Sequence, residues 1–194
     1  FTKAYYEETG QYDKAIEMYR KALYLKTHNR YYKGVILNNI AGIYYYLGDY
    51  KRADKFWKTA AEVNPVYKFP LYGLALISVK KNHWEEGLHY LNKIDSKNRD
   101  NKNVLNLEGV ILFNQGRRKE ALDSFRKGLV NNGDEIKSCI NIGAAYCLMG
   151  EYGKAGLFLT DAHKRKLGDV MALLWLIETG LRSKDNIALK KHSE

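Results

Sequence analysis

The apolar positions of this chain recur in a pattern of paired helices with a period of about 34 residues. In each period, one interval between helices is marked by a residue that favours or tolerates a turn. These residues follow one another at equal spacing: Gly48, Asn82, Gly116, Gly150 and Lys184. A further turn residue, Gly10, precedes the first of them by a slightly longer interval. Because a fixed period of this length is typical of stacked supersecondary units, the spacing predicts a helical repeat protein.

The residues that follow each turn also repeat. A large residue stands two places after the turn, a small one three places later and a large apolar one four places beyond that, as in Tyr50, Ala53 and Trp57. Residues four apart share one face of a helix, so the small residue allows close approach of two helices and the large one fills the gap beside it. The other sets are Tyr12, Ala15 and Tyr19; Trp84, Gly87 and Leu91; Arg118, Ala121 and Phe125; Tyr152, Ala155 and Leu159.

This pattern predicts two helices in every repeat and no strand, since alternating apolar runs bounded by hairpin turns are absent. The inner helices are expected near 1–8, 35–47, 69–81, 103–115, 137–149 and 170–182. The outer helices are expected near 11–26, 50–63, 84–95, 118–131, 152–166 and from 186 onward. The longer first interval adds about four residues near Arg30 to Lys33, so either the outer helix before them or the inner helix after them runs one turn longer.

The repeat resembles the tetratricopeptide repeat family, in which a large residue, a Leu-Gly pair, a Tyr, an Ala, a Phe and a Pro stand at set offsets within a unit of about 34 residues. Departures occur at Asn82, Gly87 and Arg118, and Glu108 stands where a core Leu is expected. The second and fifth repeats carry the match best: Leu37, Ile40, Ala41, Tyr44, Gly48, Tyr50, Ala53, Trp57, Ala60 and Pro65; and Cys139, Ile142, Gly143, Tyr146, Gly150, Tyr152, Ala155, Leu159 and Ala162.

The resemblance implies an all-α fold, a right-handed superhelix of helix-turn-helix repeats that covers the whole chain as a single domain. The expected repeats are 1–29 (truncated), 34–67, 68–101, 102–135, 136–169 and 170–194 (incomplete). Because the chain opens on Phe1 and stops inside a repeat, we expect a segment of a longer chain. No leader-like segment and no apolar run near the roughly 18 residues of a membrane span occurs within 1–194, so we expect a soluble segment whose compartment the sequence does not assign.

The residues that usually carry chemistry are scattered. The five histidines lie in different repeats without metal-ligand spacing, and Cys139 and Cys147 are expected to be small buried residues. No glycine-rich phosphate loop or nucleophile motif is present. Glu108 is the one carboxylate expected at a core-facing position. If it were buried without a partner, its pKa would be raised and it could act as an acid. The favoured interpretation is that Glu108 lies at the edge of the stack or pairs with a neighbouring base. We therefore predict no catalytic, cofactor or metal site, and a protein that is not an enzyme.

The resemblance also implies that the inner helices line a concave surface. Along these helices the expected lining is aromatic, aliphatic and amide-rich, with almost no charge. Such a face suits an extended or helical peptide, because Asn offers both a donor and an acceptor to a peptide backbone and Tyr and Phe offer large contact areas. The candidate peptide-binding residues are Asn38, Asn39, Tyr45, Tyr46, Tyr72, Leu76, Asn106, Val110, Phe113, Ile140 and Asn141.

This expectation favours a non-catalytic scaffold that binds a peptide segment or a protein partner in its groove. The alternative that partners dock elsewhere stays open, because Asn at two of these positions is common in the family. Members of the family that bind the carboxylate end of chaperones use Lys and Arg on the inner helices. Here the matching positions carry uncharged residues such as Asn38 and Tyr72, so no chaperone peptide of that kind is expected.

Two further hypotheses come from other features. The chain could be the regulatory or substrate-presenting segment of a larger enzyme or membrane-anchored protein, which its incomplete ends suggest. Alternatively, the chain has a net charge of +10 and could bind nucleic acid or anionic lipid through its convex surface. The basic clusters Arg117 to Lys119 and Lys164 to Lys166 are expected on that surface. The scattered distribution of the cations and the lack of a base-stacking motif disfavour this last hypothesis.

The last predicted repeat has no polar cap. In the last repeat, Leu173, Leu176 and Ile177 are expected to pack back on the fifth repeat, while Met171, Leu174, Trp175 and Leu181 lie on other faces. Alternatively, Leu174 and Trp175 form the floor of the concave groove and contact a ligand. Since a solenoid must cover its final apolar face, we expect further helical residues beyond Glu194 or self-association through the C-terminal end.

Overall fold

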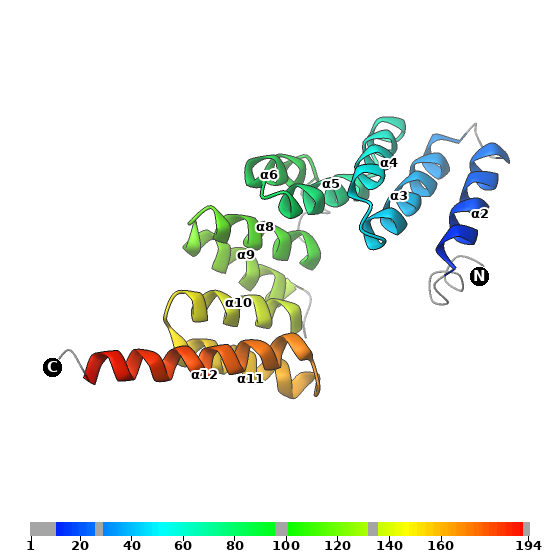
Figure 1. Cartoon of the computed structure of the whole chain (residues 1–194). Helices are drawn as coiled ribbons and strands as arrows, with labels where there is room; N and C mark the ends of the chain where they lie inside the picture. The colour runs from blue at the N-terminus through cyan, green and yellow to red at the C-terminus, as the bar shows by residue number, and fades with distance from the viewer. Residues whose placement is uncertain (1–10, 26–28, 96–100, 132–135, 192–194) are drawn as a thin grey trace. The chain divides into compact units, whose positions relative to one another are not determined.

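The structure is a computed structural model that describes residues 11–25, 29–95, 101–131 and 136–191 (Figure 1). These residues form α-helices joined by short turns, and no strand occurs among them. The all-α prediction of repeated helix-turn-helix units is confirmed. The chain divides into two compact units, residues 1–95 and 96–194, and each is described separately. The single-domain organisation expected from the sequence stays a prediction.

The first unit contains two complete helical hairpins. Helix α3 pairs with α4, α5 pairs with α6, α4 packs against α5, and α2 packs against α3. Each helix lies within a few residues of its predicted range, apart from the start of α3. The described helices of this unit are α2 (Tyr12–Leu25), α3 (Arg30–Tyr46), α4 (Tyr50–Val63), α5 (Phe69–Lys80) and α6 (Trp84–Asn92). The predicted helix at 1–8 lies outside the described residues.

The second unit contains two further hairpins and a long last helix. Helix α8 pairs with α9, α10 pairs with α11, and α12 packs against both α10 and α11. The described helices are α8 (Lys102–Asn114), α9 (Arg118–Asn131), α10 (Ile136–Leu148), α11 (Tyr152–Arg165) and α12 (Val170–Lys191).

The close approaches predicted from small and large residues form the cores of the hairpins. Ala53 is fully buried and Trp57, one turn later on α4, is 5% exposed. In the second unit Gly109 lies against the ring of Phe125, where an added Cβ would come within 2.4 Å of the ring. The alternation of small and bulky residues therefore sets how closely neighbouring helices can pack.

The four extra residues of the first interval lengthen the inner helix. Helix α3 begins at Arg30, and the side chain of Asn29 accepts hydrogen bonds from the backbone N–H groups of Tyr31 (2.9 Å) and Tyr32 (3.3 Å). Asn29 thus caps a first turn that the other inner helices lack, because it satisfies two of the backbone donors that have no partner within the helix.

We expect Asn29→Ala to lower the free energy of unfolding of the first unit by about 1 kcal/mol, because two N–H groups lose their acceptor. Asn29→Asp is the matched control, since a carboxylate accepts the same hydrogen bonds and is favoured at a helix N-terminus. Urea unfolding followed by circular dichroism measures both variants. Equal losses in the two variants would contradict a capping role for Asn29.

The predicted turn at Lys184 is wrong, and so is the separate outer helix from 186 onward. Helix α12 continues from Val170 to Lys191 without interruption. At the earlier turns the corresponding residues have positive φ angles, 58° for Asn82 and 79° to 80° for the three glycines. A Lys incurs a steric penalty in that left-handed region, so the period alone did not make Lys184 a turn.

The packing predicted for this last helix also needs correction. Leu173 and Ile177 are exposed, at 38% and 60%, whereas the sequence pattern predicts that they pack on the fifth repeat. The buried face of α12 instead carries Ala172 and Thr179, and Trp175 packs against the cluster that contains Ala172. Small side chains lie on this face because α12 approaches α10 and α11 closely.

Candidate functional site

A cavity of about 310 Å³ opens between α3 and α5 in the first unit, with one side chain reaching it from α4. It contains most of the candidate groove residues of this unit, and no charged side chain lines it. The lining residues are Asn38, Asn39, Gly42, Ile43, Tyr45, Trp57, Phe69, Tyr72, Gly73 and Leu76. Sequence reasoning therefore identified the position of the cavity from the expected inner-helix face.

Helical periodicity brings these side chains together. On α3, residues 38, 42 and 45 are three and four apart, so Asn38, Gly42 and Tyr45 share one face. On α5, Tyr72 and Leu76 are four apart and face the same cavity. A Cβ added to Gly42 would meet nothing within 4 Å, so this glycine leaves open space at the side of the cavity.

Trp57 is the lining residue that the sequence assigned only to the hairpin core. Its indole ring lies against Gly73, where a Cβ would approach the ring to 2.2 Å, and its centroid is 5.6 Å from that of Tyr45. The missing side chain of Gly73 therefore lets a residue of α4 reach the inner face. A bulky residue opposite an inner-helix glycine is the signal that could have identified Trp57.

The amide of Asn38 is committed to the protein itself. Its Oδ1 accepts a hydrogen bond from Nε1 of Trp57 at 3.0 Å, and its Nδ2 donates to the hydroxyl of Tyr67 at 3.4 Å. Asn38 therefore orients the indole ring and satisfies its buried N–H group. We interpret Asn38 as a residue that positions the wall of the cavity.

Besides the amides of Asn38 and Asn39, two tyrosines supply polar groups to the cavity. Burial raises the pKa of Tyr72, and the nearby Tyr45 raises it further. Burial likewise raises the pKa of Tyr45, with a further contribution from Tyr50. A tyrosine phenol is protonated at neutral pH and the upward shift of the pKa reinforces this, so both hydroxyls can donate as well as accept hydrogen bonds. The cavity thus offers neutral hydrogen-bonding groups between aromatic and aliphatic walls.

Tyr46 lies beside this cavity but does not line it. Its ring is 73% exposed, and it packs against Tyr12 of α2 with the ring centroids 5.2 Å apart. The one-residue difference from Tyr45 rotates the side chain by about 100° around the helix. Tyr46 therefore belongs to the contact between α2 and α3.

In the second unit, Asn106 does not present its amide to a groove. It is 2% exposed, its Nδ2 donates to Oγ of Ser138 at 3.0 Å, and its Oδ1 accepts from Nδ2 of Asn141 at 2.9 Å. The expectation that Asn106 contacts a peptide is corrected on this ground. Ile140 is also buried, at 9% exposure, whereas Val110 and Phe113 are half-buried.

Glu108 is half-buried, and its carboxylate accepts a hydrogen bond from the hydroxyl of Ser124 at 2.9 Å. This contact, together with the Coulomb interaction between Glu108 and Arg117, agrees with the interpretation of Glu108 as a carboxylate with neighbouring partners. Cys139 and Cys147 are free thiols and both are buried. Among the described residues, no three His, Cys, Asp or Glu side chains gather in a way that could hold a metal ion.

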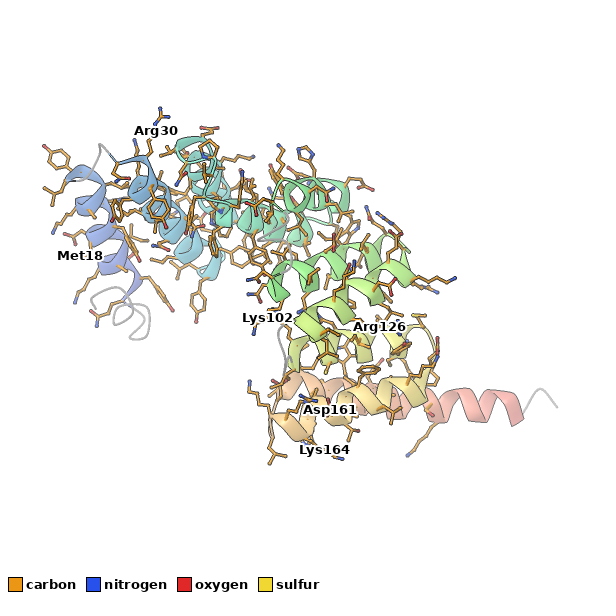
Figure 2. The ribbon with its side chains drawn as sticks, turned by 180° about the vertical axis from the view of Figure 1, so that it is seen from behind. Met18, Arg30, Lys102, Arg126, Asp161 and Lys164 are labelled. Carbon is orange, nitrogen blue, oxygen red and sulfur yellow. The ribbon has the colours of Figure 1, made fainter. Side chains whose placement is uncertain are left out.

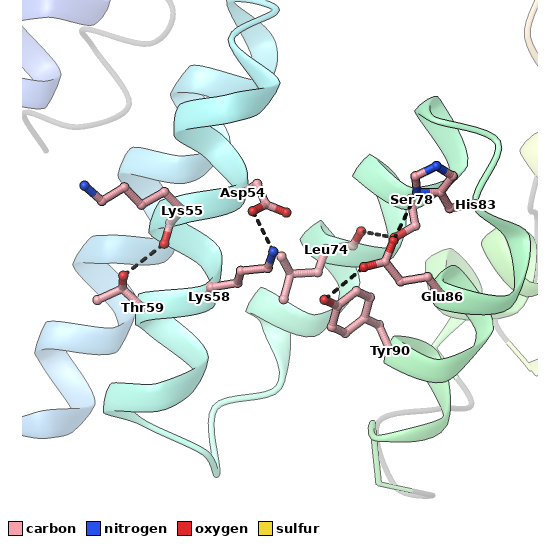
Figure 3. Close-up of polar contacts among 9 residues, drawn as sticks. All are labelled: Asp54, Lys55, Lys58, Thr59, Leu74, Ser78, His83, Glu86 and Tyr90. Atoms are coloured by element: carbon pink, nitrogen blue, oxygen red, sulfur yellow. Dashed lines mark hydrogen bonds and ion pairs between the residues drawn. The ribbon is translucent and has the colours of Figure 1, made fainter.

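The charged side chains of the outer helices pair mostly within their own helix. In the first unit, Lys58 forms an ion pair with Asp54 at 2.8 Å, and the Tyr90 hydroxyl donates to Glu86 at 3.4 Å (Figure 3). His83 Nδ1 lies 3.4 Å from the same carboxylate. The ion pair of Lys58 with Asp54 neutralises part of the positive charge at this surface.

The basic clusters singled out in the second unit behave in the same way. Arg117 pairs with Glu120, and Arg165 of α11 pairs with Asp161, one turn from the exposed Lys164 (Figure 2). Arg126 of α9 donates to the hydroxyl of Tyr146 at 2.8 Å. Part of each cluster is therefore engaged, which lowers the positive potential available to an anionic partner.

Comparison with known proteins points to one family. Residues 3–64 match the Tetratricopeptide repeat family. A TPR repeat-containing protein of Methanocaldococcus jannaschii is 30% identical over 152 residues, which are 78% of this chain and 26% of that protein. The chain thus spans about a quarter of the length of the curated relative that it matches.

Solved structures with the same fold have lower sequence identity. PilF of Pseudomonas aeruginosa has a TM-score of 0.76 at 17% identity, covering 96% of this chain and 84% of that one. MamA of Desulfovibrio magneticus RS-1 (residues 41 to the end) has a TM-score of 0.69 at 14% identity, covering 87% and 93%. YrrB, described as a TPR protein with an unusual peptide-binding site, has a TM-score of 0.63 at 17% identity, covering 93% and 100%.

No helix in the described part of the chain is both long and apolar enough to cross a bilayer.

Proposed function

We propose, from the premise that this chain belongs to the tetratricopeptide repeat family, that its first unit binds a peptide segment of a protein partner in the cavity between α3 and α5. Proteins of this fold are protein-interaction modules or scaffolds and are generally non-catalytic. The proposal extends that general role to one site and one kind of ligand.

The observation that carries the proposal is the neutral, aromatic lining of the cavity. Tyr45, Phe69 and Tyr72 offer large contact areas, and the two tyrosine hydroxyls offer hydrogen bonds to a main chain. A concave apolar surface with a few polar groups is the usual form of a binding site. The candidate residues of the second unit support the proposal less, because Asn106 and Ile140 are buried.

Two other functions receive less support. A segment that regulates or presents substrates within a larger protein is compatible with the same site, since the matched relative is about four times as long as the aligned part. Binding of nucleic acid or anionic lipid through the outer helices is disfavoured, because Arg117, Arg165 and other cations there are already in ion pairs.

A displayed library of random twelve-residue peptides tests the proposed site with the full chain. Peptides selected by the native protein should bind Tyr72→Ala at least about tenfold more weakly, because truncation removes both an aromatic wall and a hydroxyl from the cavity. Tyr24→Ala is the control, since Tyr24 is 84% exposed on α2 and does not line the cavity.

Fluorescence anisotropy with the selected peptides gives the dissociation constants, and circular dichroism verifies that each variant remains helical. A helical Tyr72→Ala protein that binds every selected peptide as tightly as the native chain would show that this cavity is not the binding site.

A further inference from the structure

A run of aromatic rings, of which Tyr31 and Phe69 are exposed and Tyr67 is half-buried, continues the cavity beyond its lining residues. Tyr31, in the extra first turn of α3, contacts Tyr67 with the ring centroids 6.0 Å apart, and Tyr67 contacts Phe69 at 5.2 Å. Phe69 itself lines the cavity. Tyr31 and Phe69 are 57% and 64% exposed, so they present ring surface to a partner.

The same stripe of α3 connects both ends of this surface. Residues 31, 35, 38, 42 and 45 are spaced four and three apart, so Tyr31 lies on the face that carries Gly42 and Tyr45. At 1.5 Å per residue, Tyr31 is about 16 Å along the helix axis from Gly42. The extra turn capped by Asn29 therefore lengthens the surface in one direction.

The hydrogen-bonding groups of this surface are suited to a particular kind of main chain. Backbone groups in the middle of α3 and α5 are paired within their helices. The amide oxygen Oδ1 of Asn38, which lines the cavity, already accepts a hydrogen bond from Nε1 of Trp57. The hydroxyls of Tyr45 and Tyr72 can donate to peptide carbonyls. The same hydroxyls can also accept hydrogen bonds, so the site suits a main chain that offers carbonyl acceptors and does not depend on N–H donors.

Charge narrows the choice of ligand further. Neither α3 nor α5 contains an Asp or Glu, and the cavity lining has no Lys or Arg. A charged side chain in the cavity would lose water without gaining an ion-pair partner. The cavity lining is therefore complementary to an uncharged side chain, and the two cations of α3, Arg30 and Lys33, lie in its first turn outside that lining.

We propose that this surface binds an uncharged, proline-rich segment in the polyproline II conformation, with one apolar side chain over Gly42 and another on the rings of Tyr31 and Tyr67. Proline removes the backbone donor, keeps the carbonyl acceptor and offers a ring face to the tyrosines. Two turns of this helix span about 19 Å, which is close to the distance between Tyr31 and Gly42. The inference rests on the proposed function and names the class of its ligand.

Defined peptides test the ligand class against the full chain. The probe is acetyl-Pro-Pro-Leu-Pro-Pro-Pro-Pro-Pro-Phe-Pro-Pro-amide, which places two apolar side chains six residues apart on one face. A second peptide has Ala in place of every Pro, and a third has Glu in place of Leu and Phe. By isothermal titration calorimetry we expect both to bind at least tenfold more weakly than the probe.

Protein variants locate the probe. Gly42→Leu should weaken binding of the probe at least tenfold, because it fills the open space at the cavity, and Tyr31→Ala should do so by removing an exposed ring. Gly156→Leu on α11 is the matched control, since a Cβ at Gly156 also meets nothing within 4 Å. Tyr31 is exposed, so its variant keeps the test decisive if Gly42→Leu does not fold.

The inference would be overturned by equal affinity for the Pro and Ala peptides or by tighter binding of the Glu peptide. It would also be overturned if both Gly42→Leu and Tyr31→Ala bound the probe as tightly as the native chain. A fifteen-nucleotide oligothymidylate that binds this surface and displaces the probe would overturn it as well. If the peptide library still yields ligands whose binding depends on Tyr72, the proposed function stands and only the ligand class fails.

Discussion

Gly73→Ala is expected to destabilise the first unit by about 3 kcal/mol, because the added methyl group would overlap the indole ring of Trp57. The added Cβ would lie 2.2 Å from Cε2 and 2.4 Å from Cδ2 of Trp57. No real Cβ contact is this short, so either the indole ring or the α5 backbone must move. The ring is 5% exposed and hydrogen-bonded to Asn38, so its displacement also costs packing and a buried hydrogen bond.

Gly42→Ala is the matched control, because Gly42 lies inside α3 and its added Cβ meets nothing within 4 Å. This variant should be more stable than the native chain by about 0.5–1 kcal/mol, since Ala lowers the conformational entropy of the unfolded helix segment. Urea unfolding followed by tryptophan fluorescence compares the two. Similar midpoints for both variants would refute the close approach of Trp57 and Gly73.

The second large effect is expected at Asn106, whose substitution by Ala should cost the second unit about 2–3 kcal/mol. Asn106 joins α8 to α10 through hydrogen bonds with Ser138 and Asn141, at 3.0 Å and 2.9 Å. Ser138 is fully buried, so the substitution leaves its hydroxyl without this partner. Removal of one member of a buried pair costs more than the hydrogen bond itself contributes.

Asn103→Ala on the same helix is the control, because Asn103 is exposed and its change should fall within about 0.5 kcal/mol of the native stability. The double variant Asn106→Ala with Ser138→Ala should recover part of the loss, since both ends of the buried pair are then apolar. Thermal and urea unfolding by circular dichroism measure these three variants and Ser138→Ala alone. A double variant that loses the sum of the two single effects would argue against a coupled pair.

The internal hydrogen bonds of the two asparagines also explain why a single test of the whole predicted groove would mislead. A combined Ala substitution of Asn38, Tyr72 and Asn106 would remove a wall of the cavity, but it would also break two internal hydrogen-bond networks. Loss of binding in that variant could therefore reflect altered structure. Exposed Tyr31 and the open space at Gly42 are better positions to test, because changes there leave the internal hydrogen bonds of Asn38 and Asn106 intact.

The sequence by itself determined the repeat, the all-α class and the approximate bounds of the helices between 11 and 182. These features follow from local information: turn residues that adopt positive φ, small residues at close contacts and apolar residues three and four apart. The same periodicity located the cavity face of α3 and α5, including Asn38, Tyr45 and Tyr72. Their position depends only on helical geometry and the order of the repeats.

Only the tertiary structure decided how each of those side chains is used. Periodicity places Asn38 and Asn106 at equivalent positions, yet Asn38 orients Trp57 at the cavity and Asn106 is buried against Ser138. The difference lies in partners that are 19 and 32 residues away, which a local pattern does not specify. Likewise, the period marked Lys184 as a turn, but the cost of a left-handed backbone at Lys left α12 continuous. Burial and pairing depend on neighbours that the fold brings together, and for that reason the function of individual positions emerged only with the packed helices.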